Sequence, residues 1–285
     1  YVELYQGTAT GLGTTPYWNW TLNETEAFTA SSLANAGDID GDGDDELLIV
    51  SSNYSSSNLD SEIGRVDMFL GSSSWGQVPD WTLNCSAIDT VLGIAIAGGG
   101  DVNGDGYDDV AISSTGTRDS PMGFSTVEVF FGSASGFSIS ADHRIEQNVQ
   151  GKLFGHELVW VDLDGNGFDE LVVGEPFNGS AYQSGKIWIF NGTISGLELP
   201  DPLTTISSNL ANDLFGSVFE SAGDVNEDGY EDLLISHRGV GKIGSLSLYL
   251  GSQFGILTTP QTLVQGSEQG DMVAATISTG GDYDD

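Results

Sequence analysis

An acidic, glycine-containing segment of nine residues occurs four times in this chain and begins a fifth time near its end. Each complete copy starts with Asp, has Gly at its sixth position, ends in Asp or Glu, and leads directly into an apolar run. The copies are residues 38–46, 101–109, 162–170 and 224–232, with a partial copy at 281–285. Their first acids, Asp38, Asp101, Asp162, Asp224 and Asp282, are 63, 61, 62 and 58 residues apart. A repeat of this length constrains the fold, because each unit must bury its apolar faces against its neighbours.

The same segments carry most of the negative charge. The chain of 285 residues has 42 acidic and 7 basic residues and a formal net charge of −35, and 22 of the acids lie in the five copies. Carboxylates at this density repel one another, so a cation is expected among them. A chain this negative is not expected to bind nucleic acid or an anionic membrane through its own charge, and it has no apolar run of the roughly 18 residues that span a bilayer.

Between the acidic segments the sequence repeats a pattern of four strands. A short strand precedes each segment, an apolar strand follows it, an alternating strand comes next, and a ragged fourth strand closes the unit. In the unit around residue 170 the first three are residues 154–161, 171–173 and 186–192, and clear fourth strands lie at 80–84 and 261–265. Forty glycines agree with an all-β reading.

The chain ends fit this pattern out of phase, with residues 2–7 as a third strand, 18–22 as a fourth and 271–280 as a first. We therefore predict an all-β fold, a β-propeller of four-stranded antiparallel blades, because ring closure leaves fewer exposed edges than an open stack. The predicted single domain 1–285 divides into outer strands of an incomplete blade at 1–22, blades at 23–84, 85–147, 148–208 and 209–265, and the start of the incomplete blade at 266–285. Since the chain lacks an initial methionine and ends inside an acidic segment, we expect it to be part of a longer secreted precursor.

Oxygen-bearing side chains at positions 1, 3, 5 and 9 of each segment, with Gly at position 6 and a main-chain carbonyl at position 7, match the ligands of Ca²⁺, which takes about six to eight oxygens. Mg²⁺ fits less well because it gives up its bound waters reluctantly. The acidic segments contain no His or Cys, which argues against zinc. One copy alone would fit a ligand-free hairpin turn equally well, whereas four copies favour cation sites. The predicted metal ligands are Asp38, Asp40, Asp42, Asp44, Glu46, Asp101, Asn103, Asp105, Tyr107, Asp109, Asp162, Asp164, Asn166, Phe168, Glu170, Asp224, Asn226, Asp228, Tyr230, Asp232, Asp282 and Asp284.

An EF-hand begins with a similar run of acids, but it needs flanking helices and a Glu at position 12. This position lies in the following strand and holds Ile49, Ile112, Val173 or Ile235. The EF-hand is therefore rejected.

The repeated segment, with Phe154-Gly155 and Phe215-Gly216 upstream and Gly174-Glu175-Pro176 downstream, resembles the FG-GAP repeat of integrin alpha-chain β-propellers over essentially the whole chain. The resemblance implies that each segment joins the first and second strands of a blade and binds Ca²⁺ on the lower face, with about four complete sites and a truncated fifth. It also implies that ligands meet the opposite face.

Several positions depart from that family's pattern. Phe-Gly becomes Phe28-Thr29 in the first unit and Leu92-Gly93 in the second, and the ninth residue is Glu in two segments. Gly-Ala-Pro survives only once, as Gly174-Glu175-Pro176.

These features predict an extracellular, calcium-stabilised adhesion or ligand-binding module without catalytic activity, binding a protein or glycan. Its contact face would use the connections 51–63, 113–125, 174–184 and 236–244. They carry the interface residue types Tyr54, Arg118, Phe177, Tyr182, His237 and Arg238.

Two alternatives stay open. One is a structural subunit of an extracellular filament or surface layer that self-assembles through the incomplete blade. The other is a polysaccharide-active propeller, for which the sequence offers little, since His143, His156 and His237 lie in different units. Cys85 has no internal disulfide partner. Acceptor motifs for N-glycosylation occur at Asn19, Asn23, Asn53, Asn84, Asn178 and Asn191.

Overall fold

The structure is a computed structural model of residues 1–285. It describes residues 1–9, 11–22, 28–52, 64–72, 75–84, 90–116, 125–147, 152–178, 182–239, 243–268, 271 and 273–278. Several residues singled out above lie outside these ranges, namely Asn23, Asn53, Tyr54, Cys85, Arg118, Asp282 and Asp284. Within the ranges, no helix is long and apolar enough to cross a membrane.

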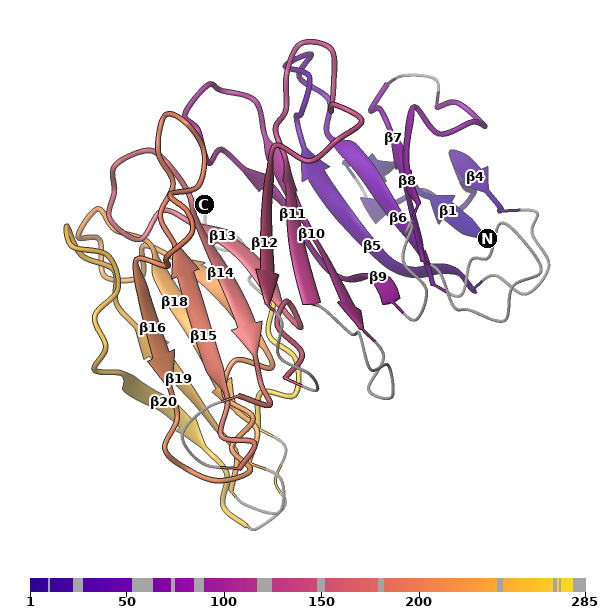
Figure 1. Ribbon diagram of the computed structural model, residues 1–285. Helices are drawn as coiled ribbons and strands as arrows, with labels where there is room; N and C mark the ends of the chain where they lie inside the picture. The colour runs from indigo at the N-terminus through magenta and orange to yellow at the C-terminus, as the bar shows by residue number, and fades with distance from the viewer. Residues whose placement is uncertain are drawn as a thin grey trace.

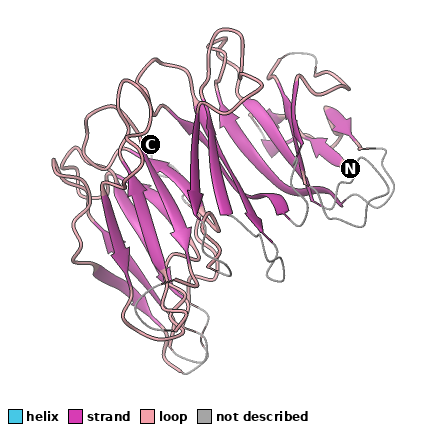
Figure 2. Ribbon diagram, viewed as in Figure 1, coloured by secondary structure: helices cyan, strands magenta, loops and turns pink. Residues whose placement is uncertain are grey.

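Four antiparallel sheets of four strands follow one another along the chain and lie side by side (Figures 1 and 2). The first sheet contains β5 (Phe28–Gly37), β6 (Glu46–Ser52), β7 (Arg65–Phe69) and β8 (Trp81–Asn84). The second contains β9 (Thr90–Gly100), β10 (Asp109–Gly116), β11 (Ser125–Phe130) and β12 (His143–Gln147). The third contains β13 (Leu158–Val161), β14 (Glu170–Glu175), β15 (Lys186–Phe190) and β16 (Thr204–Ser207). The fourth contains β17 (Phe219–Gly223), β18 (Asp232–His237), β19 (Ser245–Tyr249) and β20 (Gln261–Gln265).

In each sheet the strands are hydrogen-bonded in chain order, so every sheet is an up-and-down meander. This confirms the prediction of an all-β fold made of four-stranded antiparallel sheets. Closure of the sheets into a ring, and the division of the chain into blades, stay predictions.

Short strands near the N-terminus add two small sheets. β1 (Val2–Leu4) pairs with β4 (Trp18–Trp20), and β2 (Gly7–Thr8) pairs with β3 (Gly11–Leu12). The β1–β4 pair packs against the first sheet through an aromatic cluster, with the ring centroids of Trp18 and Phe69 5.0 Å apart. At the other end, residues 273–276 form turns and bends, and no strand lies in the described part of the range 271–280, where the sequence predicts a first strand.

The hydrophobic core lies between consecutive sheets. Each of the three junctions between four-stranded sheets has its own cluster of buried residues drawn from both partners. The second strands of the first three sheets supply residues to clusters on both sides. In β14, Leu171 and Val173 pack toward the second sheet, while Val172 packs toward the fourth. A continuous apolar run is therefore what this strand requires.

A Phe-Gly pair precedes the first strand of the third sheet and of the fourth sheet. Phe154 and Phe215 are buried against the preceding sheet, and Gly155 and Gly216 follow them with φ of 80° and 73°. A Cβ on Gly216 would lie 2.6 Å from Cγ2 of Ile187, which is too close for any other residue. Leu92 takes the place of the Phe in the second sheet and is also buried.

The face of the fourth sheet that points away from the third sheet is less covered than the corresponding faces of the first three sheets. At the second position of the acidic loops, Ile39, Val102 and Leu163 are fully buried under the next sheet, whereas Val225 is 52% exposed. On β20, Val264 is 50% exposed, although the equivalent Ile145 and Ile206 of the second and third sheets are buried. The fourth sheet thus presents apolar residues that elsewhere cover a neighbour.

Candidate metal centres

Each complete acidic segment connects the first strand of a sheet to the second, so the four loops follow β5, β9, β13 and β17. Hydrogen bonds between successive loops show that they lie next to one another at one end of the sheets. The second-to-third connections lie at the opposite end, because the strands are antiparallel.

The first acid of each loop orders the backbone of its own turn. Asp38 Oδ1 accepts hydrogen bonds from the amides of Gly41 (2.8 Å) and Asp42 (3.0 Å), and its Oδ2 accepts one from Gly43 (3.0 Å). Asp101, Asp162 and Asp224 repeat this arrangement with the amides at positions 5 and 6. Carboxylate oxygens are therefore held at the centre of each turn.

The glycines in these turns meet a backbone requirement. Gly41, Gly104 and Gly165 at position 4 have φ of 75°, 69° and 67°. In the fourth loop this position holds Glu227, which adopts φ of 60°. A side chain with a Cβ is strained in this conformation.

Positions 3 and 5 add oxygens on the same side. The amide at position 5 donates to the side-chain oxygen at position 3, and the amide at position 7 donates to the oxygen at position 5, as between Asp105 and Asn103 (2.9 Å) and between Tyr107 and Asp105 (3.0 Å). One carboxylate oxygen from each of Asp38, Asp40 and Asp42 lies within 4.8 Å of the others. In the third loop Asp162, Asp164 and Glu170 meet the same criterion. Both groups could hold a metal ion.

The ninth residues have a second role that the sequence did not predict. Glu46 is buried and accepts hydrogen bonds from the amides of Ile39 (2.7 Å) and Gly71 (3.1 Å), which ties its loop to the chain just beyond the third strand. Asp109 and Asp232 repeat both bonds with the corresponding amides. The sequence feature that could have indicated these bonds is the Gly that follows each third strand.

Glu170 differs from the other ninth residues and supports the fit of a cation. Its Oε2 accepts a hydrogen bond from Leu163 (2.9 Å), but its buried Oε1 has no hydrogen-bond partner. The amide of Gly192 corresponds to that of Gly71, but it does not reach hydrogen-bond geometry with this oxygen. Burial raises the pKa of Glu170, and the Gly192 amide opposes that rise only in part. A buried carboxylate oxygen without a partner is costly, and a hard cation bound by oxygen ligands would satisfy it.

Without a cation the ninth residues are poor places for negative charge. Burial, reinforced by neighbouring carboxylates, raises the pKa of Asp109 and of Glu170 to about 8, and burial raises that of Glu46 to about 7. Hydrogen bonds from main-chain amides oppose the shift without cancelling it. The structure thus brings together Asp38, Asp40 and Asp42 in the first loop and Asp162, Asp164 and Glu170 in the third. The other predicted ligands, including the carbonyl groups at position 7, stay predictions.

At the opposite end of the sheets, Tyr182 is exposed, and Phe177 and Arg238 are partly buried. His237 Nδ1 lies 2.8 Å from Asp213 Oδ2, a pairing that the sequence did not predict because 24 residues separate the two. Glu175, which replaces the Ala of Gly-Ala-Pro, is buried and accepts hydrogen bonds from the side chains of Trp188 (2.7 Å) and Asn178 (2.6 Å). These contacts order the second-to-third connection of the third sheet.

Comparison with known proteins points to one repeat family. The model of the FG-GAP repeat matches residues 92–120 and 154–190. Integrin alpha-6 of Gallus gallus is 31% identical over 137 residues, covering 47% of this chain and 12% of that protein. Integrin alpha-IIb of Mus musculus is 30% identical over 200 residues, covering 61% of this chain and 18% of that protein. Integrin alpha-PS5 of Drosophila melanogaster is 34% identical over 113 residues, covering 39% and 11%.

The chain therefore carries FG-GAP repeats and has an integrin-like FG-GAP domain. The alignments span less than a fifth of the length of these relatives.

Replacing Glu227 with Gly should raise the free energy of unfolding by about 0.5–1 kcal/mol, because the strain of a left-handed Cβ-bearing residue exceeds the extra backbone entropy of Gly. Urea denaturation of the full chain measures this. Glu227→Gln is the matched control, since it removes the charge and keeps the Cβ. If the Gln variant gains as much as the Gly variant, charge repulsion and not backbone strain is the cause.

In excess EDTA the chain should melt at a higher temperature near pH 5 than near pH 8. The ninth acids have folded-state pKa values above their ordinary values, so the folded state binds more protons than the unfolded state between about pH 4 and pH 8, and stability falls as pH rises through that window. Differential scanning fluorimetry measures the trend. Asp109→Asn, which cannot ionise, should flatten it, and a melting temperature in EDTA that rises toward pH 8 would contradict this reading.

Proposed function

We propose that this protein is an extracellular β-propeller that requires Ca²⁺ for stability and acts as a non-catalytic adhesion or ligand-binding module. The calcium requirement rests on one observation, the repetition of the same oxygen arrangement in four loops. Buried carboxylates in these loops have raised pKa values. One of their oxygens, Oε1 of Glu170, has no hydrogen-bond partner. The integrin alpha chains to which the chain is similar support the adhesive role. The comparisons and the FG-GAP match support placing the domain at a cell surface.

The proposed ligands in each loop are the side chains at positions 1, 3, 5 and 9 and the carbonyl at position 7. Bound Ca²⁺ would supply positive charge that stabilises the ionised form of these acids. The first acid of each loop holds its oxygens in place through two or three main-chain amides. In the first, second and fourth loops the ninth acid also joins the loop to the chain beyond the third strand. Binding energy at each loop thereby becomes folding energy for a whole sheet.

The proposed contact face lies at the end of the sheets opposite the loops. Tyr182 is 72% exposed in the second-to-third connection of the third sheet, and Arg238 follows β18 in the fourth. Exposed aromatic residues and Arg are the side chains that most often dominate protein interfaces. A protein or glycan ligand on this face is consistent with both. His237 pairs with Asp213 and packs against Phe215 with the two rings tilted and their centroids 5.0 Å apart, which favours a structural role over a catalytic one.

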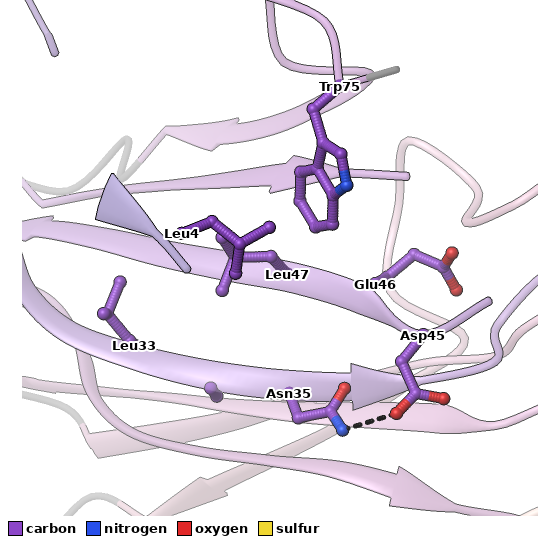
Figure 3. Close-up of a pocket in the computed structure, with 8 residues that line it drawn as sticks. Leu4, Leu33, Asn35, Asp45, Glu46, Leu47 and Trp75 are labelled. Atoms are coloured by element: carbon purple, nitrogen blue, oxygen red, sulfur yellow. Dashed lines mark hydrogen bonds between the residues drawn. The ribbon is translucent and has the colours of Figure 1, made fainter. Parts of the chain in front are cut away.

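A second candidate, assembly of copies into a filament or surface layer, is favoured by apolar surface at both ends of the sheet array, where the β1–β4 pair leaves a pocket beside the first sheet and the fourth sheet is partly uncovered. Beside the first sheet lies a pocket of about 320 Å³ lined by Leu4, Leu33, Leu47 and Trp75 and edged by Asn35 and Asp45 (Figure 3). At the other end Val225, Leu263 and Val264 are about half exposed. Because successive sheets pack face to face throughout, the two ends present related surfaces that could join head to tail. A monodisperse monomer in size-exclusion chromatography with light scattering, at saturating calcium, would remove this candidate.

Chelation with EDTA should lower the melting temperature of the full chain markedly and make it sensitive to limited proteolysis, because the clustered carboxylates then repel without compensation. Calcium should restore both properties, and equal magnesium should restore them poorly because Mg²⁺ rarely uses an all-protein oxygen cage. Unchanged melting and proteolysis in EDTA would show that the loops need no cation.

Beads coated with the full chain should adhere to cultured cells in calcium, and Tyr182→Ala should reduce adhesion about tenfold if this residue anchors the contact face. Phe254→Ala is the matched control, because Phe254 is an aromatic residue 84% exposed in the third-to-fourth connection, at the same end as the acidic loops. If both variants lose adhesion equally, or if neither loses adhesion, the contact lies elsewhere.

A further inference from the structure

We propose that the calcium sites of neighbouring sheets are energetically coupled through the seventh and eighth residues of each loop, so that occupation of one site strengthens binding at the next. This inference rests on the proposed function, since it assumes that the loops bind calcium. It assigns a positioning role to residues that are not side-chain ligands in the predicted sites, chiefly Asp108 and Asp169.

In the second and third loops the eighth residue holds the first ligand of the preceding loop. The amide of Asp108 donates to the carbonyl oxygen of Asp38 (3.2 Å), and Asp108 Oδ2 accepts a hydrogen bond from the amide of Asp38 (2.7 Å). Asp169 makes the same two bonds with Asp101, at 3.1 Å and 2.7 Å. Both main-chain groups of a predicted ligand are thus fixed by the adjacent loop.

The third junction keeps half of this arrangement. The amide of Glu231 donates to the carbonyl oxygen of Asp162 (3.1 Å), but Glu231 Oε2 accepts a hydrogen bond from Ser221 Oγ (3.1 Å) within its own sheet. The junction between the third and fourth loops therefore lacks the side-chain bond, and we expect weaker coupling there.

The seventh residue makes a second contact between loops. A Cβ on Gly41 would lie 2.8 Å from Cε1 of Tyr107, and a Cβ on Gly104 would lie 2.6 Å from Cε1 of Phe168. Tyr230 covers Gly165 in the same manner, with Cδ1 at 3.1 Å from the corresponding point. Position 4 therefore has to be Gly in these loops for two reasons, its left-handed backbone and the aromatic ring that lies against it.

These contacts join two sites through a very short path. Asp108 lies between Tyr107, whose carbonyl is a predicted ligand of the second site, and Asp109, whose side chain is another. Cation binding that orders residues 107–109 also positions the Asp108 carboxylate, which orders the backbone of Asp38 in the first site. Because coupling of two equilibria is reciprocal, binding at the first site favours the second to the same extent.

The first loop supplies an internal control for this arrangement. Its seventh and eighth residues are Asp44 and Asp45, both exposed, and Asp45 Oδ2 accepts a hydrogen bond from Asn35 Nδ2 of its own sheet (2.8 Å, Figure 3). Among the described residues, Asp45 thus holds the same position as Asp108 without holding a neighbouring loop. Differences between the two identify the contribution of the inter-loop bonds.

The test is a calcium titration of the ¹⁵N-labelled full chain, followed by NMR. The amide signals of Gly43, Gly106, Gly167 and Gly229 report each loop separately, because each amide donates to the first acid of its own loop. Asp108→Ala removes no predicted ligand, yet it should raise the half-saturation concentration of the first loop at least about fivefold. Asp45→Ala removes a carboxylate of the same charge beside the first site without removing an inter-loop bond, and it should raise that concentration clearly less. Asp108→Asn keeps an acceptor oxygen for the Asp38 amide and should retain more of the wild-type affinity.

A second variant tests coupling directly. Asp105→Ala removes a predicted ligand of the second loop and should weaken binding at the first and third loops while sparing the fourth. In the Asp108→Ala background, which keeps the main-chain bond and the Tyr107 contact, the same change should affect the first loop less. If the first and third loops keep their affinity in Asp105→Ala, the sites are independent and the inference is wrong. If no loop signal responds to calcium in the unmodified chain, the proposed function itself fails.

Discussion

In the part of the chain that the structure describes, no sheet has a core of its own, and the packing of each sheet against the next is the constraint on which the remaining structure depends. The second strands of the first three sheets pack on both faces, as Leu171 and Val172 do on opposite sides of β14. The Phe-Gly pairs fit the same constraint, because the Phe ring packs against the preceding sheet and the Gly lets the backbone approach that sheet closely. A single sheet removed from this series would lose burial on both faces.

This packing brings the acidic loops into contact with one another, which is where the electrostatic problem arises. Apolar residues at the second position, such as Ile39 and Val102, are buried under the next sheet and draw each loop toward its neighbour. The ninth acids are buried with them and have raised pKa values. Hydrophobic burial thus places carboxylates where their charge is unfavourable, and a bound cation is the simplest means of offsetting that cost.

Sequence periodicity was sufficient to predict the strands and their order, because a pattern of alternating and continuous apolar runs reflects burial directly. It was also sufficient to predict that the side chains of Asp38, Asp40 and Asp42 lie close together, since a tight turn with Gly at defined positions leaves few alternatives. It was not sufficient for the hydrogen bonds of Glu46 to Gly71 or of Asp108 to Asp38, whose partners are 25 and 70 residues apart. The described residues 273–277 contain no strand, and they align with residues 153–157, which also precede β13 without forming a strand. The residues that align with β13 are 278–281, and 279–281 lie outside the described residues.

By itself, the sequence determined the repeat, the all-β class and the chemistry of the loops, because these depend on residue type and on spacing within a few residues. The tertiary structure alone decided that Asp45 and Asp108, at the same loop position, have different partners, and that Val225 is exposed where Ile39 is buried. The physical reason is that these properties belong to the junction between sheets. They depend on what lies beside a residue in space, which the repeat pattern of one unit does not contain.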